Sequence, residues 1–188
     1  MVELKLISSR VELKKNQPVC LITGDGRCLK NDIDTFLKDN IEHDVMAIAR
    51  SFKQYPGNIL HWAMVDSEAN KWWAEHLPPV NNGELPIRHT LGKCDGFDVN
   101  WDDGQEDGAL WHGTSALFAT LVALNLGYEK IILAGCPMDK EGHWYYSEEW
   151  KGPDWKEEDY KIWKEFSKTE DAKKVKSLSG FTKEVLNG

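Results

Sequence analysis

Short, almost wholly apolar runs that alternate with helical patterns constrain the fold of this chain most strongly. The passage from Gly113 to Asp139 reads GTSALFATLVALNLGYEKIILAGCPMD: an apolar helical pattern, a glycine and then a buried strand. Runs of the same kind begin at Val19, Val45 and Ile59. Strands that are apolar at every position are buried on both faces, which is typical of parallel sheets covered by helices. The pattern therefore predicts a doubly wound α/β domain with a mainly parallel sheet.

The length and composition indicate one domain rather than several. The chain has 188 residues, 41% of them hydrophobic and 29% charged, as expected for a globular domain with one core. We interpret residues 1–188 as a single domain, with the polar, aromatic C-terminal third from about residue 139 as a candidate lid. The formal net charge of −8 argues against a nucleic-acid partner, because phosphate contacts need clustered Lys and Arg. No apolar run approaches the roughly 20 residues that span a bilayer, so no membrane partner is expected.

Helix-capping residues and helix-ending glycines predict the bounds of further helices. One helix is expected after the first apolar run, with Asn31 or Asp32 as its cap, and another from about Thr114 to Leu126 with Gly127 as C-cap. The tetrapeptide VELK, which occurs twice before residue 15, is interpreted as an N-terminal hairpin. The other expected elements are strands near 87–90, 97–101 and 175–178, and helices near 66–76, 157–169 and after 180.

The cysteines indicate a reducing compartment. The four of them are far apart and form no Cys-x-x-Cys pair: Cys20, Cys28, Cys94 and Cys136. Two lie within predicted strands and are interpreted as small core residues rather than zinc ligands. The N-terminal MVELKLISSR lacks the apolar core of a signal peptide, so a cytoplasmic location is expected.

Ligands of doubly wound domains bind beyond the carboxyl ends of the strands. The first such end, Gly24-Asp25-Gly26, stands between a strand and a helix, where a phosphate-binding turn is found. The third glycine of the dinucleotide motif is missing, because Leu29 takes its place. Since a carboxylate repels phosphate, Asp25 is expected to accept a hydrogen bond from a hydroxyl or an amide. A glycine turn required only by backbone geometry is the alternative.

Two further segments offer groups for binding and catalysis. Gly113-Thr114-Ser115 opens the buried helix, and the free N–H groups of a helix N-terminus attract phosphate; ordinary N-capping is the alternative. The segment DKEGHWYYSEEW follows the last central strand directly and begins at Asp139. Its His143 is a candidate general base, and the phenols of Tyr145 and Tyr146 are candidate donors to phosphate oxygens. An aromatic loop folded onto its own core explains the same residues without a ligand.

No metal or other cofactor is expected. Asp98, Asn100 and Asp102 match half of a calcium loop, but Asp103 and Ala109 replace the glycine and glutamate that the loop needs. The Asp-x-Asp pair at 32 and 34 has the spacing used by metal-dependent sugar transferases, but it lies at a helix start, where capping explains it.

Two known groups of proteins share motifs with this chain. VCLITGDGRCLKND resembles the opening strand and turn of bacterial sialyltransferases, and GTSALFATLVALNLGYEKIILAGCPMD resembles their later Thr-Ser-Gly helix and the strand after it. The ending VKSLSGFTKEVLNG resembles that of short phage and prophage proteins of unassigned function, a likeness that covers most of the chain.

The sialyltransferase resemblance implies a Rossmann-like domain that binds a cytidine nucleotide sugar without a metal. It assigns the turn glycines to Gly24 and Gly26 and the phosphate contacts to Thr114 and Ser115. The resemblance also implies that His143 is the base and that Tyr145 and Tyr146 contact the departing phosphate. Two positions depart from the pattern: Asp25 replaces an amide residue, and Ala116 replaces a glycine.

Three functions are consistent with these residues. The first is binding of a nucleotide or nucleotide sugar, with metal-independent glycosyl transfer. The second is a non-catalytic phage or prophage interaction protein on the same fold, whose acidic, aromatic surface would meet a protein partner. The third is a magnesium-dependent pyrophosphokinase-like enzyme, for which Asp66 and Asp139 are the placed carboxylates. The oligomeric state has no signature in the sequence.

Overall fold

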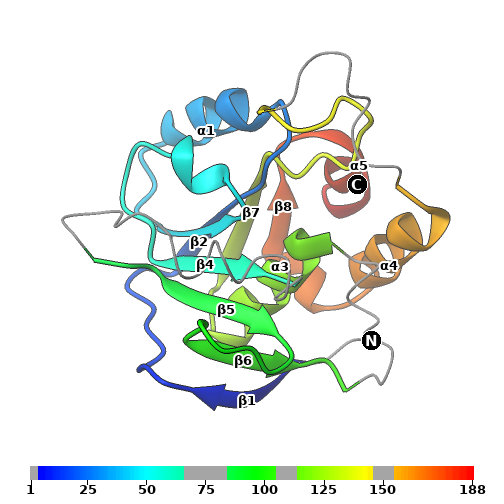
Figure 1. The fold of residues 1–188 in the computed structure, drawn as a ribbon. Coiled ribbons are helices and arrows are strands. Elements are labelled where there is room, and N and C mark those ends of the chain that lie inside the picture. The colour runs from blue at the N-terminus through cyan, green and yellow to red at the C-terminus, as the bar shows by residue number, and fades with distance from the viewer. Residues whose placement is uncertain (1–3, 66–83, 105–113, 146–154) are drawn as a thin grey trace.

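The computed structural model describes residues 4–65, 84–104, 114–145 and 155–188, which form one eight-stranded sheet flanked by helices (Figure 1). The strand order is β1-β6-β5-β4-β3-β2-β7-β8. The strands are β1 (Lys5–Ser9), β2 (Val19–Thr23), β3 (Asp44–Ile48), β4 (His61–Met64), β5 (Ile87–Leu91), β6 (Val99–Asp102), β7 (Lys130–Ala134) and β8 (Val175–Ser177). The helices are α1 (Leu29–Leu37), α3 (Thr114–Asn125), α4 (Glu157–Ser167) and α5 (Gly180–Leu186), with short 3₁₀ turns η1 (Ser51–Lys53) and η3 (Asp171–Lys174).

The mainly parallel sheet predicted from the apolar runs is confirmed. Every neighbouring pair of strands is parallel except β1 and β6. Strands β2 and β3 are buried at all five positions and β4 at all four, as expected for strands covered on both faces. Among the described residues, no helix is both long and apolar enough to cross a membrane.

The predicted N-terminal hairpin is wrong. Strand β1 pairs antiparallel with β6, at the edge of the sheet, rather than with the second VELK segment. Residues 11–14 form no strand, because the chain turns immediately after β1. The hydroxyl of Ser9 contacts the backbone of Val11 in this turn, and the backbone N–H of Arg10 donates to Asp98 instead.

Helix α1 begins earlier than the predicted caps allow. Its N-cap is Cys28, so Asn31 and Asp32 lie inside the first turns. Asp32 is buried with Leu29, Ile33 and Phe36 on the stripe that faces the sheet. The expectation that Asp32 caps the helix is therefore wrong, because its carboxylate is committed to the end of β7.

Helix α3 is buried around most of its circumference and contacts β2, β3, β4 and β7. Its predicted bounds hold to within one residue, and Gly127 follows it at a positive φ of 80°, as a C-terminal glycine does. The remaining strands and helices lie within a few residues of the predicted positions, except that the helix expected near 66–76 falls outside the described residues.

The order of the strands creates a switch point between β2 and β7. The chain leaves β2 through α1 to β3 and continues outward to β6, and then returns through α3 to β7 on the other side of β2. Figure 1 shows β7 and β8 beside α5 at one end of the sheet, with β5, β6 and β1 at the other. Ligands of open α/β sheets bind at the carboxyl ends of strands at such a point.

Candidate functional site

The carboxyl ends of β2 and β7 pack backbone against backbone. The N–H of Gly24 donates to Ala134 (2.8 Å), and the N–H of Gly26 donates to Gly135 (2.8 Å). A Cβ atom at Gly24 would lie 2.6 Å from the carbonyl oxygen of Gly135, and one at Gly26 would lie 2.5 Å from Cδ of Pro137. Close contact between the two strand ends therefore requires both glycines, whether or not a ligand contacts them.

A buried carboxylate from α1 fixes this junction. Oδ2 of Asp32 accepts hydrogen bonds from the N–H of Gly135 (2.8 Å) and the hydroxyl of Ser179 (2.6 Å). The hydroxyl of Thr182 donates to the carbonyl of Cys136 (2.7 Å), so the start of α5 is held against the same segment. These bonds set the direction in which the chain leaves β7.

A cavity of about 260 Å³ lies at the switch point. It brings together eight of the residues predicted from the sequence: Gly24, Asp25, Gly26, Thr114, Ser115, Asp139, His143 and Tyr145. The other two, Gly113 and Tyr146, lie outside the described residues. Its other walls come from α3, from the ends of β3, β4 and β7, from the segment after β7 and from the start of the C-terminal region: Ile48, Ala49, Met64, Ala116, Gly135, Cys136, Pro137, Met138, Gly142 and Trp155.

Asp25 is the buried charged group of the cavity wall. It is 7% exposed, and its Oδ2 accepts a hydrogen bond from the backbone N–H of Arg50 (3.2 Å). Oδ1 makes no hydrogen bond within the described part of the chain. Burial raises the pKa of Asp25 to about 6, although the N–H and charge of Arg50, the Trp144 indole and Tyr145 all favour the ionised form. The Trp144 indole lowers this pKa by its proximity, since neither its Nε1 nor Oδ1 of Asp25 makes a hydrogen bond to a described residue.

The segment that carries His143 is held against the turn after β2. Gly26 and His143 form an antiparallel bridge, the N–H of Trp144 donates to the carbonyl of Asp25 (3.0 Å), and the N–H of Arg27 donates to Gly142 (3.2 Å). The predicted proximity of the two segments thus arises from backbone pairing.

Aromatic stacking orders the side chains at the mouth of the cavity. The imidazole of His143 stacks on the Tyr145 ring, with centroids 5.3 Å apart and planes 9° apart. The guanidinium of Arg50 lies 4.4 Å from the centroid of the Tyr145 ring, within cation–π range. Burial lowers the pKa of His143; the carbonyl of Asp25 opposes this effect, and the charge of Arg50 adds to it. His143 is therefore neutral at neutral pH, as a general base must be.

The backbone around the cavity adopts conformations that L-residues seldom take. Thr114 has φ = 71°, Ala49 has φ = 48° and Met138 has φ = 50°, and all three line the cavity. Such conformations cost about 1–3 kcal/mol each and gather at ligand sites. The Oγ1 atom of Thr114 is buried and makes no hydrogen bond to other described residues. The start of α3 therefore presents a polar group and helix N–H groups to the cavity.

Asp139 shapes the cavity rim. Its Oδ1 accepts a hydrogen bond from the N–H of Glu141 (3.0 Å), and its carbonyl accepts one from the Trp155 indole (2.9 Å). No group of three or more His, Cys, Asp or Glu side chains within the described ranges has a geometry suited to a metal ion. Asp66, the other carboxylate proposed for magnesium, lies outside those ranges.

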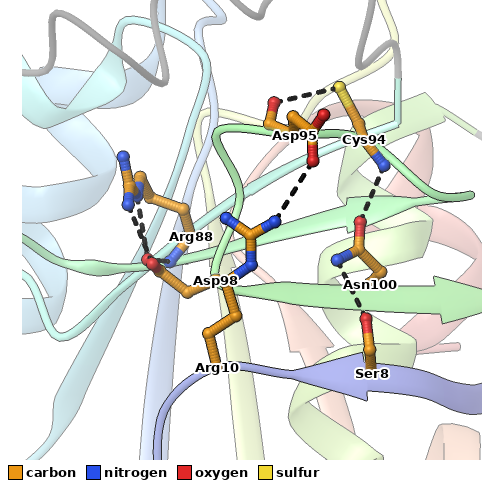
Figure 2. A network of polar contacts seen from close by, with 7 residues as sticks. All are labelled: Ser8, Arg10, Arg88, Cys94, Asp95, Asp98 and Asn100. Carbon is orange, nitrogen blue, oxygen red and sulfur yellow. Dashed lines mark hydrogen bonds and ion pairs between the residues drawn. The ribbon is translucent and has the colours of Figure 1, made fainter.

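Asp98 and Asn100, which match part of a calcium loop in sequence, have a structural role at the other end of the sheet (Figure 2). Arg88 donates to both carboxylate oxygens of Asp98 (2.8 Å each). Burial alone would raise the pKa of Asp98, but the paired guanidinium brings it below the usual value. Asn100 accepts from the N–H of Cys94 (2.9 Å) and donates to Ser8 (3.2 Å), which ties β1 to β6. Neither side chain is arranged around a cation.

Among the polar and aromatic residues around the site, Asp32, Arg50 and Trp155 were not predicted as site residues from the sequence. Asp32 had a signal, since it occupies a position on the apolar stripe of α1, where a charged residue must find buried partners. Arg50 and Trp155 had none, because their contacts depend on how distant segments pack. Comparison of the chain with protein-family models, curated proteins and solved structures gives no significant match.

Proposed function

We propose that the cavity binds the phosphate end of a nucleotide or nucleotide sugar and that the protein transfers the sugar without a metal. The main observation that supports this proposal is that the N-terminus of α3, Asp25, His143 and Tyr145 all line one cavity, which lies at the switch point between β2 and β7. The sequence resemblance to bacterial sialyltransferases assigns the same segments to a cytidine nucleotide sugar.

The phosphate is assigned to Thr114 and Ser115. The first N–H groups of α3 lack partners within the helix and carry its partial positive charge, which favours an anion at this end. The buried Oγ1 of Thr114 supplies a hydroxyl donor beside them. Arg50, which lies over Tyr145, adds positive charge near the cavity mouth.

In the proposed transfer, His143 removes the proton from an acceptor hydroxyl. The oxygen of that hydroxyl forms a bond to the anomeric carbon of the sugar, and the bond from this carbon to the phosphate oxygen breaks. Tyr145 and Tyr146 donate hydrogen bonds to the departing phosphate, whose charge grows as the bond breaks. The lowered pKa of His143 keeps the imidazole able to accept the proton at neutral pH.

The test places a negative charge where the phosphate is proposed to bind. Ser115→Asp should weaken binding of cytidine mono- and diphosphate about tenfold or more, because it removes a charge-assisted hydrogen bond and adds repulsion. The fold should persist, since Asp is favourable in the first turn of a helix. The matched control is Asn31→Asp, which adds the same charge at an exposed first-turn position of α1. Calorimetry decides: equal affinities for all three proteins, or no binding by the unmodified protein, contradict the proposal.

A further inference from the structure

Asp25 has a hydrogen-bonding capacity that the described protein does not use. The residue is only 7% exposed, its Oδ1 is buried, and it lines the cavity. Oδ2 is engaged by the N–H of Arg50, whereas Oδ1 makes no hydrogen bond within the described residues. A buried carboxylate oxygen without a donor is costly, and a ligand that donates to it recovers that cost.

Burial disfavours the charged form of Asp25, but neighbouring groups offset part of this effect, and with a pKa of about 6 the carboxylate is mainly ionised at pH 7. The backbone N–H of Arg50 donates to it, and the Arg50 guanidinium, the Trp144 indole and Tyr145 all stabilise its negative charge. Other titratable groups around the same cavity are His143, on the bridged segment, the thiol of Cys136, at the end of β7, and Asp139, on the rim. Because an ionised carboxylate only accepts hydrogen bonds, the complementary ligand group is a hydroxyl or an amine.

The size of the cavity limits which ligands that carry such a hydroxyl or amine can bind. At about 260 Å³ it lies just below the roughly 300–1,000 Å³ of pockets that enclose drug-sized ligands. A single sugar ring with its phosphate is suited to this volume, and a base or second sugar would extend outward. With the phosphate at α3, the donor closest to it along such a ligand is a ring hydroxyl.

We propose that Asp25 is the specificity-determining residue of the cavity, and that its ionised Oδ1 accepts a hydrogen bond from a ribose hydroxyl of the bound nucleotide. The cavity then selects ribonucleotides over their deoxy analogues. This inference rests on the proposed nucleotide-binding function and assigns to Asp25 a role in selectivity that differs from the phosphate binding assigned to Thr114 and Ser115.

The experiment compares three probes: cytidine 5′-monophosphate and its 2′-deoxy and 3′-deoxy analogues. The unmodified protein should bind the ribonucleotide about tenfold or more tightly than at least one analogue, because a hydrogen bond to a charged group is lost. Asp25→Asn should reduce this ratio, because its neutral amide oxygen is a weaker acceptor, and Asp25→Ala, which has no acceptor, should bring it close to one. The exposed Asp34→Asn should leave the ratio unchanged. The ratio isolates the hydroxyl contact, because removing the carboxylate changes the repulsion of all three phosphates equally.

A pH series adds a second readout. Between about pH 7 and 5 the ribonucleotide preference of the unmodified protein should shrink, because protonated Asp25 no longer accepts through both oxygens. The probes' own phosphate also takes up a proton near pH 6, and the ratio cancels this contribution. Equal binding of all three probes by the unmodified protein at pH 7 overturns the inference and leaves the proposed function standing. Binding of none of them overturns both.

Discussion

Acid should destabilise this protein through a buried chain of side chains that crosses the sheet. The indole of Trp101 donates to Nδ1 of His89 (3.1 Å), and Nε2 of His89 lies 3.0 Å from Nδ1 of His61. Nε2 of His61 lies 3.3 Å from the hydroxyl of Tyr128, which donates to Oδ2 of Asp44 (2.8 Å). The chain is satisfied when each imidazole accepts on Nδ1 and donates from Nε2, which makes both histidines neutral.

The sign of the pH dependence follows from the two histidines. Burial lowers the pKa of His61 from 6.5 to about 4, and burial with the neighbouring His61 lowers the pKa of His89 well below its usual value. At a pH between the lowered pKa of a folded histidine and the ordinary pKa of 6.5 in the unfolded chain, the unfolded chain binds more protons than the folded chain. The free energy of unfolding therefore falls as the pH falls through this range. An imidazole that stays neutral in the folded chain and titrates with its ordinary pKa in the unfolded chain costs about 2 kcal/mol of stability between pH 7 and pH 5.

Asp25 opposes this loss. Because burial raises its pKa from 3.8 to about 6, protonation below pH 6 favours the folded chain. Over the same pH range this contributes about 1 kcal/mol of stability. The expected net loss of about 3 kcal/mol is a large part of the 5–15 kcal/mol by which domains are usually stable.

Urea denaturation at pH 7, 6 and 5, followed by tryptophan fluorescence, measures the effect. The unmodified protein should lose about 3 kcal/mol, and His89→Gln should lose only about 1, because one titrating imidazole has been removed. Asp25→Asn should lose about 4, because the opposing carboxylate is gone. A free energy of unfolding that is constant or rises toward pH 5, or a His89→Gln variant with the unmodified pH slope, would refute the reasoning.

Two further predictions concern the strand junction and metals. Asp32→Asn should lower the free energy of unfolding by about 2 kcal/mol, because Gly135 and Ser179 lose a charged acceptor. The control Asp34→Asn, at an exposed position of the same helix, should change it by less than about 0.5 kcal/mol. Equal stability of the two variants in urea would contradict the stabilising role of Asp32. Treatment with EDTA should leave the affinity for cytidine diphosphate unchanged in calorimetry, and stoichiometric zinc or calcium in elemental analysis after dialysis would count against a metal-independent site.

The sheet could be predicted from the sequence because burial on both faces leaves a local pattern. Val19, Val45 and Ile131 begin or lie in runs of consecutive apolar residues, and all three belong to central parallel strands. The cavity followed from the same reasoning, since parallel strands bring their carboxyl ends to one edge of the sheet. Gly24, Asp25, Ser115 and other strand-end and helix-start residues could therefore be grouped without knowledge of their contacts.

The contacts themselves could not be predicted, because they join residues far apart in the chain. Asp32 accepts from residues 103 and 147 positions away, and nothing in the sequence around α1 identifies these donors. The reason for Gly24 and Gly26 was equally hidden. A glycine needed for a ligand and a glycine needed for close backbone packing give the same sequence, and only the short distances to Gly135 and Pro137 show that packing requires both glycines here.

Asp25 and Asp32 belong to the same strand–helix unit and are equally buried, yet the structure gives them opposite relations to stability. Oδ2 of Asp32 has two donors within the protein, so removing its charge should destabilise the fold. Oδ1 of Asp25 is buried without a donor among the described residues, and its pKa of about 6 against 3.8 means that ionisation at pH 7 costs the folded chain about 3 kcal/mol. Asp25→Asn should therefore raise the free energy of unfolding at pH 7 while it weakens the preference for ribonucleotides, a trade of stability for function that is common at binding sites. Urea denaturation and calorimetry on the same variant test both effects. A variant that is less stable and discriminates between the probes as strongly as the unmodified protein would mean that Asp25, like Asp32, serves the fold alone.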